Sequence, residues 1–206
     1  MLSQSVASEL REAISAGEFQ PGEQLSEVKA AERFNCSRNT LRESFTRLAA
    51  ERIVERIPNR GVFLAMPDAD YIRDLFAARA AIEPAAVRWG AFADAPSLVT
   101  LTSSAFDYAA RGEHQEVSAI NQRFHRTLVA ALGSPTLNEQ MDNLLARMRL
   151  TFLLAIPRYP RLHADHIQGN ITLATLIADG KRREAATLAH DSLMNTCEKI
   201  LAVLDD

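Results

Sequence analysis

Three short helical segments followed at once by two strand-like runs constrain the fold of this chain more than any other feature. Apolar residues recur at helical spacing in each segment, and a serine stands where each can be capped. The helices are expected at residues 3–16, about 26–34 and about 37–51. The runs "IVERI" and "VFLA" then flank the turn letters "PNRG", which is typical of a β-hairpin. Because only a few residues around Asn35 separate the second and third helices, the pattern predicts a winged helix-turn-helix.

Beyond "AMPDADY" the chain changes character, and every further segment has a helical pattern. These helices are expected at about 69–93, 96–110, 115–132, 136–156, 161–179 and 181–204. The first of them should turn Ile72, Leu75, Phe76, Ile82 and Trp89 inward. The predicted fold is therefore mainly α. It has an N-terminal winged helix-turn-helix with a small β-hairpin wing, residues 1–66, and a C-terminal antiparallel α-helical bundle, residues 67–206.

The charge of the whole chain does not indicate a nucleic-acid-binding protein, because the 206 residues carry a net charge of −3. The local balance is more informative. Six arginines but only three glutamates lie within residues 37–60. Local charge is what acts on a phosphate backbone, since salt screens interactions beyond about 10 Å. The third helix and the hairpin are therefore the part of the chain that is suited to DNA.

The third helix, "CSRNTLRESFTRL", combines an apolar stripe with arginines and short polar side chains at its start. A solvated surface helix would account for that composition. The alternative is a recognition helix, whose N-terminal part enters the major groove. Arginine can bind guanine, asparagine can read adenine, and hydroxyl groups suit phosphates or bases. The hairpin that follows favours the second interpretation. The candidate DNA-contacting residues are Ser37, Arg38, Asn39, Thr40, Arg42 and, at the hairpin tip, Arg60 and Gly61.

The stretch from "GEFQPGEQLSE" through "SRNTLRESFTRL" to "RGVFL" resembles the winged-helix domain of the GntR family of bacterial transcription regulators. The resemblance spans about residues 5–64. It implies that Arg38, Thr40 and Arg42 contact an operator in double-stranded DNA, and that Arg60 and Gly61 form a wing contact in the minor groove. One departure is Arg52, where family members commonly carry glycine.

The second half resembles the FCD ligand-binding domain of the FadR branch, through "RAAIEPAAVRWGA", "NQRFHRTLVAALGSPTL" and "DHIQGNITLATLIADGKRREAATLAHDSL". Six helices resemble the VanR-type subgroup. Many relatives bind a divalent metal through D-x-x-x-H and two later histidines. The corresponding residues are Asn121, His125, His166 and His190. Asparagine at the usual aspartate position should weaken binding, although three imidazoles can still hold Zn²⁺ or Ni²⁺. Histidines satisfied by hydrogen bonds in the core are the alternative. His163, three residues before His166, is expected to face another way, and His114 is expected to be solvated.

Relatives use the metal to hold a small organic acid, so arginines in apolar helices are candidate effector ligands. A guanidinium can bind a carboxylate through two hydrogen bonds. The candidates are Arg79, Arg147 and Arg149. For Arg79, a salt bridge to Glu83, four residues on, is an equal alternative.

The expected function is a ligand-responsive regulator, not an enzyme, that binds DNA as a homodimer in the cytoplasm. Repression is commoner than activation in the family. A metal-dependent hydrolase is a second hypothesis, but no H-E-x-x-H motif or nucleophile elbow is present, and it leaves residues 37–61 unexplained. A repressor that senses the metal itself is a third. No signal peptide or membrane segment is expected.

Overall fold

The computed structural model describes residues 2–205, with the side chains of Leu2 and His163 outside the description. The chain forms two compact units. The first runs to Asp68 and includes Asp142–Leu154, whereas the second comprises Ala69–Met141 and the chain from Ala155 onward. The first unit's N-terminal segment ends at Asp68, and the predicted domain boundary was at residue 66. The grouping of residues 142–154 with the first unit was not predicted.

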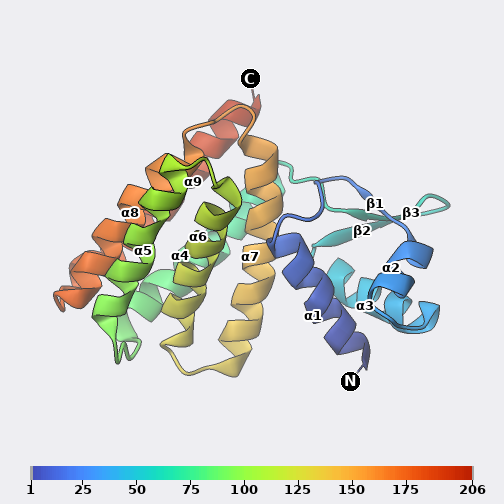
Figure 1. Ribbon diagram of the computed structural model, residues 1–206, viewed down its shortest axis with the longest axis horizontal. Helices are drawn as coiled ribbons and strands as arrows, with labels where there is room; N and C mark the ends of the chain where they lie inside the picture. The colour runs from blue at the N-terminus through green and yellow to red at the C-terminus, as the bar shows by residue number, and fades with distance from the viewer. Residues whose placement is uncertain (1, 206) are drawn as a thin grey trace. The chain divides into compact units, whose positions relative to one another are not determined.

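The first unit contains the three predicted helices and a small antiparallel sheet (Figure 1). Its elements are α1 (Leu2–Ser15), β1 (Gln24–Leu25), α2 (Glu27–Arg33), α3 (Arg38–Ala50), β2 (Val54–Ile57) and β3 (Gly61–Leu64). The strands β2 and β3 form the expected hairpin. The sequence did not predict β1, which adds a third strand against β3 and gives the order β1-β3-β2. This arrangement confirms the winged helix-turn-helix.

Local capping explains where the helices of this unit begin and end. The Oγ atom of Ser26 accepts a hydrogen bond from the backbone of Lys29, and Oγ of Ser37 accepts one from Thr40. Such caps satisfy N–H groups that have no partner in the first helical turn. Between the two helices Asn35 has φ 45°, a left-handed conformation that asparagine tolerates better than most residues. This conformation of Asn35 allows the short connection between α2 and α3 that a helix-turn-helix requires.

The core of the first unit lies between α1 and α3. Leu10 and Ile14 of α1 and Phe45 of α3 are fully buried, with 0% of their surface exposed. Two polar contacts join the same elements. Ser44 Oγ donates a hydrogen bond to the carbonyl of Ser3, at 2.8 Å, and Arg11 binds both carboxylate oxygens of Glu51, which follows α3. The packing therefore fixes the position of α3 from behind and leaves its other face to solvent.

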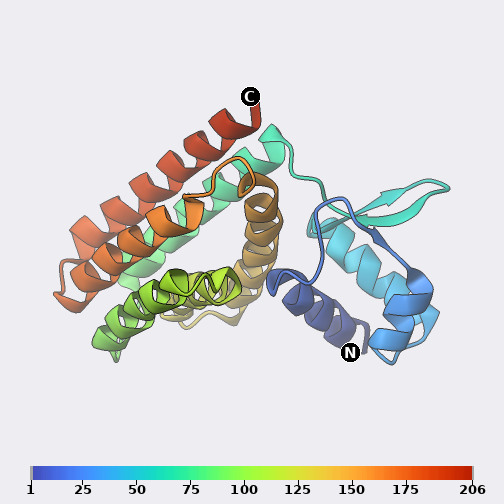
Figure 2. The same ribbon diagram turned by 45° about the horizontal axis from the view of Figure 1, so that its top comes forward.

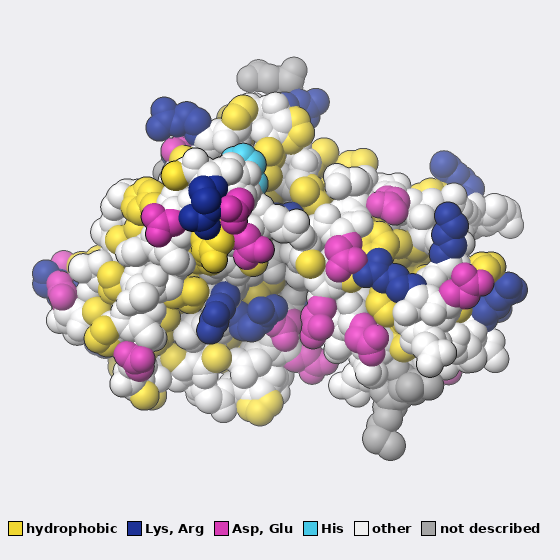
Figure 3. All heavy atoms as spheres, in the orientation of Figure 1, with side chains coloured by type: hydrophobic (Ala, Val, Ile, Leu, Met, Phe, Trp, Pro, Cys, Tyr) yellow, Lys and Arg dark blue, Asp and Glu magenta, His cyan; other side chains and the backbone are white. Residues whose placement is uncertain are grey.

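On the face drawn in Figure 3, Lys and Arg are interspersed with Asp and Glu and form no broad patch of one sign. This agrees with the near-neutral balance of the sequence. On this face, basic side chains therefore stand at separate positions among acidic ones.

The second unit is built from the remaining helices, in the number that the sequence predicted. They are α4 (Ala69–Trp89), α5 (Ala95–Ala110), α6 (His114–Ala130), α7 (Pro135–Ala155, shared between the units), α8 (Leu162–Ala178) and α9 (Arg182–Asp205). Helix α9 packs along α4, α8 packs along α5, and α6 contacts α4, α5 and α8 (Figure 2). The helical domain that the sequence predicted is thereby confirmed.

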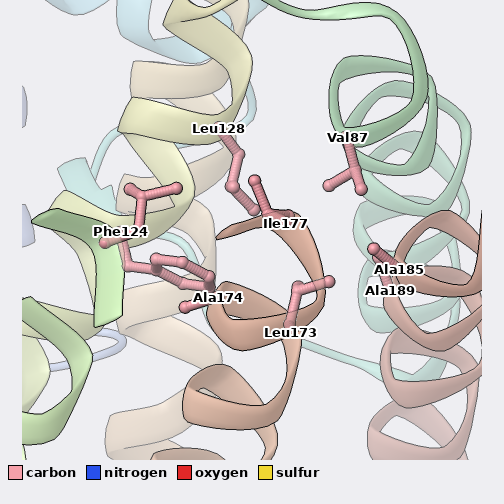
Figure 4. Close-up of a cluster of buried hydrophobic side chains, with 9 residues drawn as sticks. Val87, Phe124, Leu128, Leu173, Ala174, Ile177, Ala185 and Ala189 are labelled. Atoms are coloured by element: carbon pink, nitrogen blue, oxygen red, sulfur yellow. The ribbon is translucent and has the colours of Figure 1, made fainter. Parts of the chain in front are cut away.

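An apolar cluster holds five of these helices together (Figure 4). Its buried residues are Val87 of α4, Phe124 and Leu128 of α6, Leu173, Ala174 and Ile177 of α8, and Ala185 and Ala189 of α9, with Leu98 of α5. Small alanines on α9 let that helix approach its neighbours closely. Burial of this apolar surface is the main stabilising contribution that the bundle shows.

The prediction that Trp89 faces the core is wrong. Trp89 is 72% exposed and stacks with Arg88, whose guanidinium carbon lies 4.4 Å from the ring centre. The buried stripe of α4 continues from Glu83 through Ala86 to Gly90, at helical spacing. Trp89 lies beside that stripe and is the last residue of the helix, so its ring turns outward. Among the described residues, no helix is both long and apolar enough to cross a membrane.

Candidate functional site

The start of α3 presents the predicted base-contacting side chains to solvent. Ser37, Arg38, Asn39 and Arg42 are exposed, and Thr40 is half-buried. The opposite face carries Leu41, Phe45 and Leu48, each with 0% of its surface exposed. The N-terminal turn is fixed because Ser37 Oγ accepts a hydrogen bond from the Thr40 backbone at 3.1 Å. The helix thus has one face for the core and a rigid, polar N-terminus for a ligand.

An ion pair and a neighbouring arginine order the exposed face of α3. The Nε atom of Arg42 lies 3.1 Å from both carboxylate oxygens of Glu27, and its Nη2 lies 2.9 Å from Oε2. Arg56, on β2, donates from Nη2 to the carbonyl of Arg42 at 2.7 Å and to Oγ1 of Thr46 at 2.9 Å. Helix α3 is therefore tied to α2 on one side and to the wing on the other.

The tip of the wing places the other predicted DNA contacts in the open. Arg60 and Gly61 are exposed, and Gly61 has φ 108°, a conformation that favours glycine. The side-chain amide of Gln24 donates to the Arg60 carbonyl at 2.7 Å. The guanidinium of Arg60 lies 5.4 Å from the ring centre of Phe63. These contacts hold the tip in one conformation with its arginine at the surface.

In the bundle, Arg79, Glu83 and His125 form a buried cluster between α4 and α6. The Arg79 Nε atom donates to Glu83 Oε1 at 2.6 Å, so the structure contains the salt bridge that was the alternative to an effector contact. The His125 Nδ1 atom lies 2.6 Å from Glu83 Oε2. Burial alone would raise the pKa of Glu83, but Arg79 and His125 outweigh burial and lower the pKa to about 2. An ionised carboxylate only accepts hydrogen bonds, so Nδ1 of His125 carries the proton.

A small cavity lies between α5, α6 and α8, and one of its lining residues, Asn121, precedes His125 by four positions on α6. Its volume is about 10 Å³, room for about one water molecule. Its polar lining comes from Thr102, Asn121, His166 and Asn170, and apolar residues complete it. Asn170 Nδ2 donates to Asn121 Oδ1 at 2.7 Å. The lining therefore offers amide, hydroxyl and imidazole groups, and no carboxylate.

The predicted metal ligands do not converge as one set. Asn121 and His166 share the cavity, His125 is bound to Glu83, and His190 has 53% of its side chain exposed with Nδ1 3.0 Å from Asp191. Ala189, at the preceding position, is on the buried stripe of α9, and each residue turns the helix by about 100°, so His190 points outward. Within residues 2–205, no three His, Cys, Asp or Glu side chains that the structure describes gather to hold a metal ion. The donor set as described does not fit a metal centre.

Arg147 and Arg149, the other predicted effector ligands, lie in the part of α7 that groups with the first unit. Both are buried, with 6% and 7% of their surface exposed. Burial lowers the pKa of Arg149 from its usual range. The structure thus describes them in a different unit from Arg79, and their contact with an effector stays a prediction.

Several residues of these sites were missed from the sequence. Asn170 follows His166 by four residues, and that helical spacing was a signal for a shared face. Glu27 is the last residue of the family-like stretch "GEFQPGEQLSE", yet nothing local shows that it binds Arg42. Glu83 was considered only as a partner for Arg79, and its contact with His125 joins residues 42 positions apart.

Comparisons with known proteins agree with both halves of this description. Residues 2–64 match the family model described as bacterial regulatory proteins, gntR family, and residues 74–195 match the FCD domain. The Nta operon transcriptional regulator of Aminobacter aminovorans is 26% identical over 90% of this chain and 88% of its own length. The transcriptional repressor GlaR of Escherichia coli is 28% identical over 88% of each chain.

Among solved structures, a GntR transcriptional regulator from Rhodococcus sp. RHA1 superimposes with a TM-score of 0.82. It is 29% identical, and the match covers 97% of both chains. The match extends over both units of the fold. Proteins of this family regulate transcription and are not enzymes, so the hydrolase hypothesis is excluded. The chain belongs to the GntR family of bacterial transcriptional regulators and combines the family's DNA-binding domain with an FCD domain, as in FadR-type regulators.

Proposed function

We propose that this protein is a repressor that binds a pseudo-palindromic operator as a homodimer in the cytoplasm. The observation that carries the proposal is the exposed start of α3, where Arg38, Asn39 and Arg42 face solvent on a helix anchored by its opposite face. Two such helices related by a two-fold axis reach major grooves about one helical turn apart. Repression is supported by the similarity to GlaR, which is named as a repressor.

The wing supplies the second contact in this proposal. Arg60 at its tip enters the adjacent minor groove, where narrow A·T-rich segments attract arginine. The hydrogen bond from Gln24 and the left-handed Gly61 hold the tip in the required conformation. Recognition-helix contacts then specify the sequence, while wing contacts add affinity and read groove width.

A small organic acid is the effector that we propose for the bundle, whose six helices we assign to the VanR-type subgroup. Arg79 is the residue of that unit that we propose to bind the carboxylate of the effector. The effector carboxylate would compete with Glu83 for the Arg79 guanidinium. The cavity lined by Asn121 and His166 has room for about one water, so an effector that binds there requires α5, α6 and α8 to move. That movement couples the two functions, because a ligand shifts an equilibrium only by binding one arrangement better than the other.

Selection of binding sites from fragments of the source genome tests the proposal. We expect a short pseudo-palindrome to be enriched, and the genes beside it to indicate the effector pathway. Sugar acids, amino acids, dicarboxylates and aromatic acids are then screened by the shift in melting temperature that each produces. Arg79→Ala and His125→Ala, each compared with its own unliganded melting temperature, should lose that shift. Enrichment of no sequence at all would contradict the DNA-binding proposal, and unchanged shifts in both variants would contradict the effector proposal.

A further inference from the structure

The contact between Glu27 and Arg42 is unusual because it engages the arginine that points to the DNA. Both side chains are partly exposed, with 57% of Arg42 and 33% of Glu27 accessible. Exposed ion pairs of this kind contribute little to stability, typically about 0–1 kcal/mol. Stability therefore does not account for a carboxylate at this position. The carboxylate does, however, determine how the Arg42 guanidinium is oriented.

The guanidinium of arginine is a planar fork with five N–H donors. Glu27 occupies the edge formed by Nε and Nη2, since its oxygens lie 2.9 and 3.1 Å from those atoms. The free edge, which includes Nη1, points away from the carboxylate. That edge has the spacing that binds O6 and N7 of guanine through two hydrogen bonds.

We infer that Glu27 is a specificity-determining residue of the operator contact, which holds Arg42 in one orientation for a base edge and opposes its use on phosphates. This inference rests on the proposed function. Glu27 does so from the first position of α2, where the Ser26 cap fixes the backbone. Its own charge also repels phosphates, so a non-specific approach of Arg42 to the DNA backbone is disfavoured.

The surrounding charges keep the arrangement intact. The hydrogen bond from Arg42 is the main cause that lowers the pKa of Glu27, and the positive charges of Arg42, Arg38 and Arg56 add to it. Glu27 therefore stays ionised at neutral pH. Glu27 is hydrogen-bonded to Arg42, and removal of its carboxylate would leave the Arg42 guanidinium without this partner and able to contact a phosphate.

The test uses the full-length protein and two duplexes of equal length, the operator found by genomic selection and a scrambled sequence. Glu27→Ala should reduce the ratio of operator affinity to scrambled affinity by about tenfold. It should also tighten binding to the scrambled duplex and steepen the dependence of log affinity on log salt by about one. Glu27→Gln removes the charge and keeps one acceptor for Arg42, so it should steepen the salt dependence but keep more of the discrimination.

Glu18→Ala is the matched control. Glu18 forms an exposed ion pair with Arg33 in the same unit, so this variant removes the same charge without touching Arg42. Its ratio of affinities should equal that of the parent. An unchanged ratio in Glu27→Ala, in protein whose melting temperature matches the parent, would overturn the inference alone. A parent protein that does not distinguish operator from scrambled DNA would overturn the proposed function and the inference with it.

Discussion

Glu83 on α4 accepts a hydrogen bond from His125 Nδ1 on α6, at 2.6 Å, through its Oε2 atom. Its other oxygen, Oε1, accepts one from Arg79 Nε at the same distance. All three side chains are buried, and Glu83 retains only 1% of its surface. A buried carboxylate is costly unless it is paired and hydrogen-bonded. The two contacts meet that requirement, and the one with His125 fastens α4 to α6. The second unit therefore contains a buried ion pair, Arg79–Glu83, whose carboxylate also binds a histidine of the neighbouring helix.

Removal of the carboxylate should destabilise the protein strongly. Glu83→Ala is expected to lower the free energy of unfolding by about 3–5 kcal/mol, because the Arg79 charge would stay buried without its carboxylate. Urea unfolding followed by circular dichroism measures the change. Glu198→Ala, at an exposed position on α9, is the control and should alter the free energy by less than about 0.5 kcal/mol. Equal effects from both variants would contradict the assigned role of Glu83.

The same cluster predicts how stability depends on pH. The pKa of Glu83 lies at about 2 in the folded protein, below its ordinary value of 4.5. A depressed pKa means that the unfolded chain takes up the proton first, so the contribution is complete above about pH 4.5 and is lost as pH falls towards 2. Its size is on the order of 3 kcal/mol. The difference in unfolding free energy between parent and Glu83→Gln should shrink over that range. Parallel pH curves would count against the pairing.

Metal analysis tests whether the histidines form a metal centre. His190 is exposed and His125 is bound to Glu83. We therefore expect elemental analysis to find far less than one Zn²⁺ or Ni²⁺ ion per chain in protein purified without a metal-affinity column. A chelator should leave both the melting temperature and operator binding unchanged. Stoichiometric metal that is lost in His125→Ala and His166→Ala would show that these side chains rearrange into the site expected from the family.

The fold was predictable because its determinants are local. Ser26 and Ser37 cap helices as expected, and Asn35 adopts the left-handed conformation that ends the second helix. Periodicity fixed the remaining helices to within a few residues. Strand β1 was missed because Gln24 and Leu25 form too short a run to show alternation, and they become a strand only through pairing with Phe63 and Val62. Trp89 was misplaced because hydrophobicity alone does not separate the edge of a buried stripe from its centre.

The sites divide in the same way. The predicted DNA contacts lie within one helix and one hairpin, so their common exposure could be inferred from spacing. The contacts Glu27–Arg42, Glu83–His125 and Asn121–Asn170 join residues 15, 42 and 49 positions apart. No local pattern specifies such pairs, because they depend on which helix faces arrive together in the tertiary structure. This is why the four candidate metal ligands that the family resemblance implied do not come together as one set.

Operator binding by an Arg42 variant tests the central claim most directly. Fluorescence anisotropy with the selected operator duplex, at one fixed salt concentration, gives the dissociation constant of each protein. Arg42→Ala should weaken binding by about 1–3 kcal/mol, the usual value of a bidentate base contact. Arg47→Ala is the matched control, since Arg47 is also exposed but lies in the last turn of α3, and it should bind nearly as the parent does. Equal affinity of Arg42→Ala and the parent for the operator would contradict the assignment of α3 as the recognition helix.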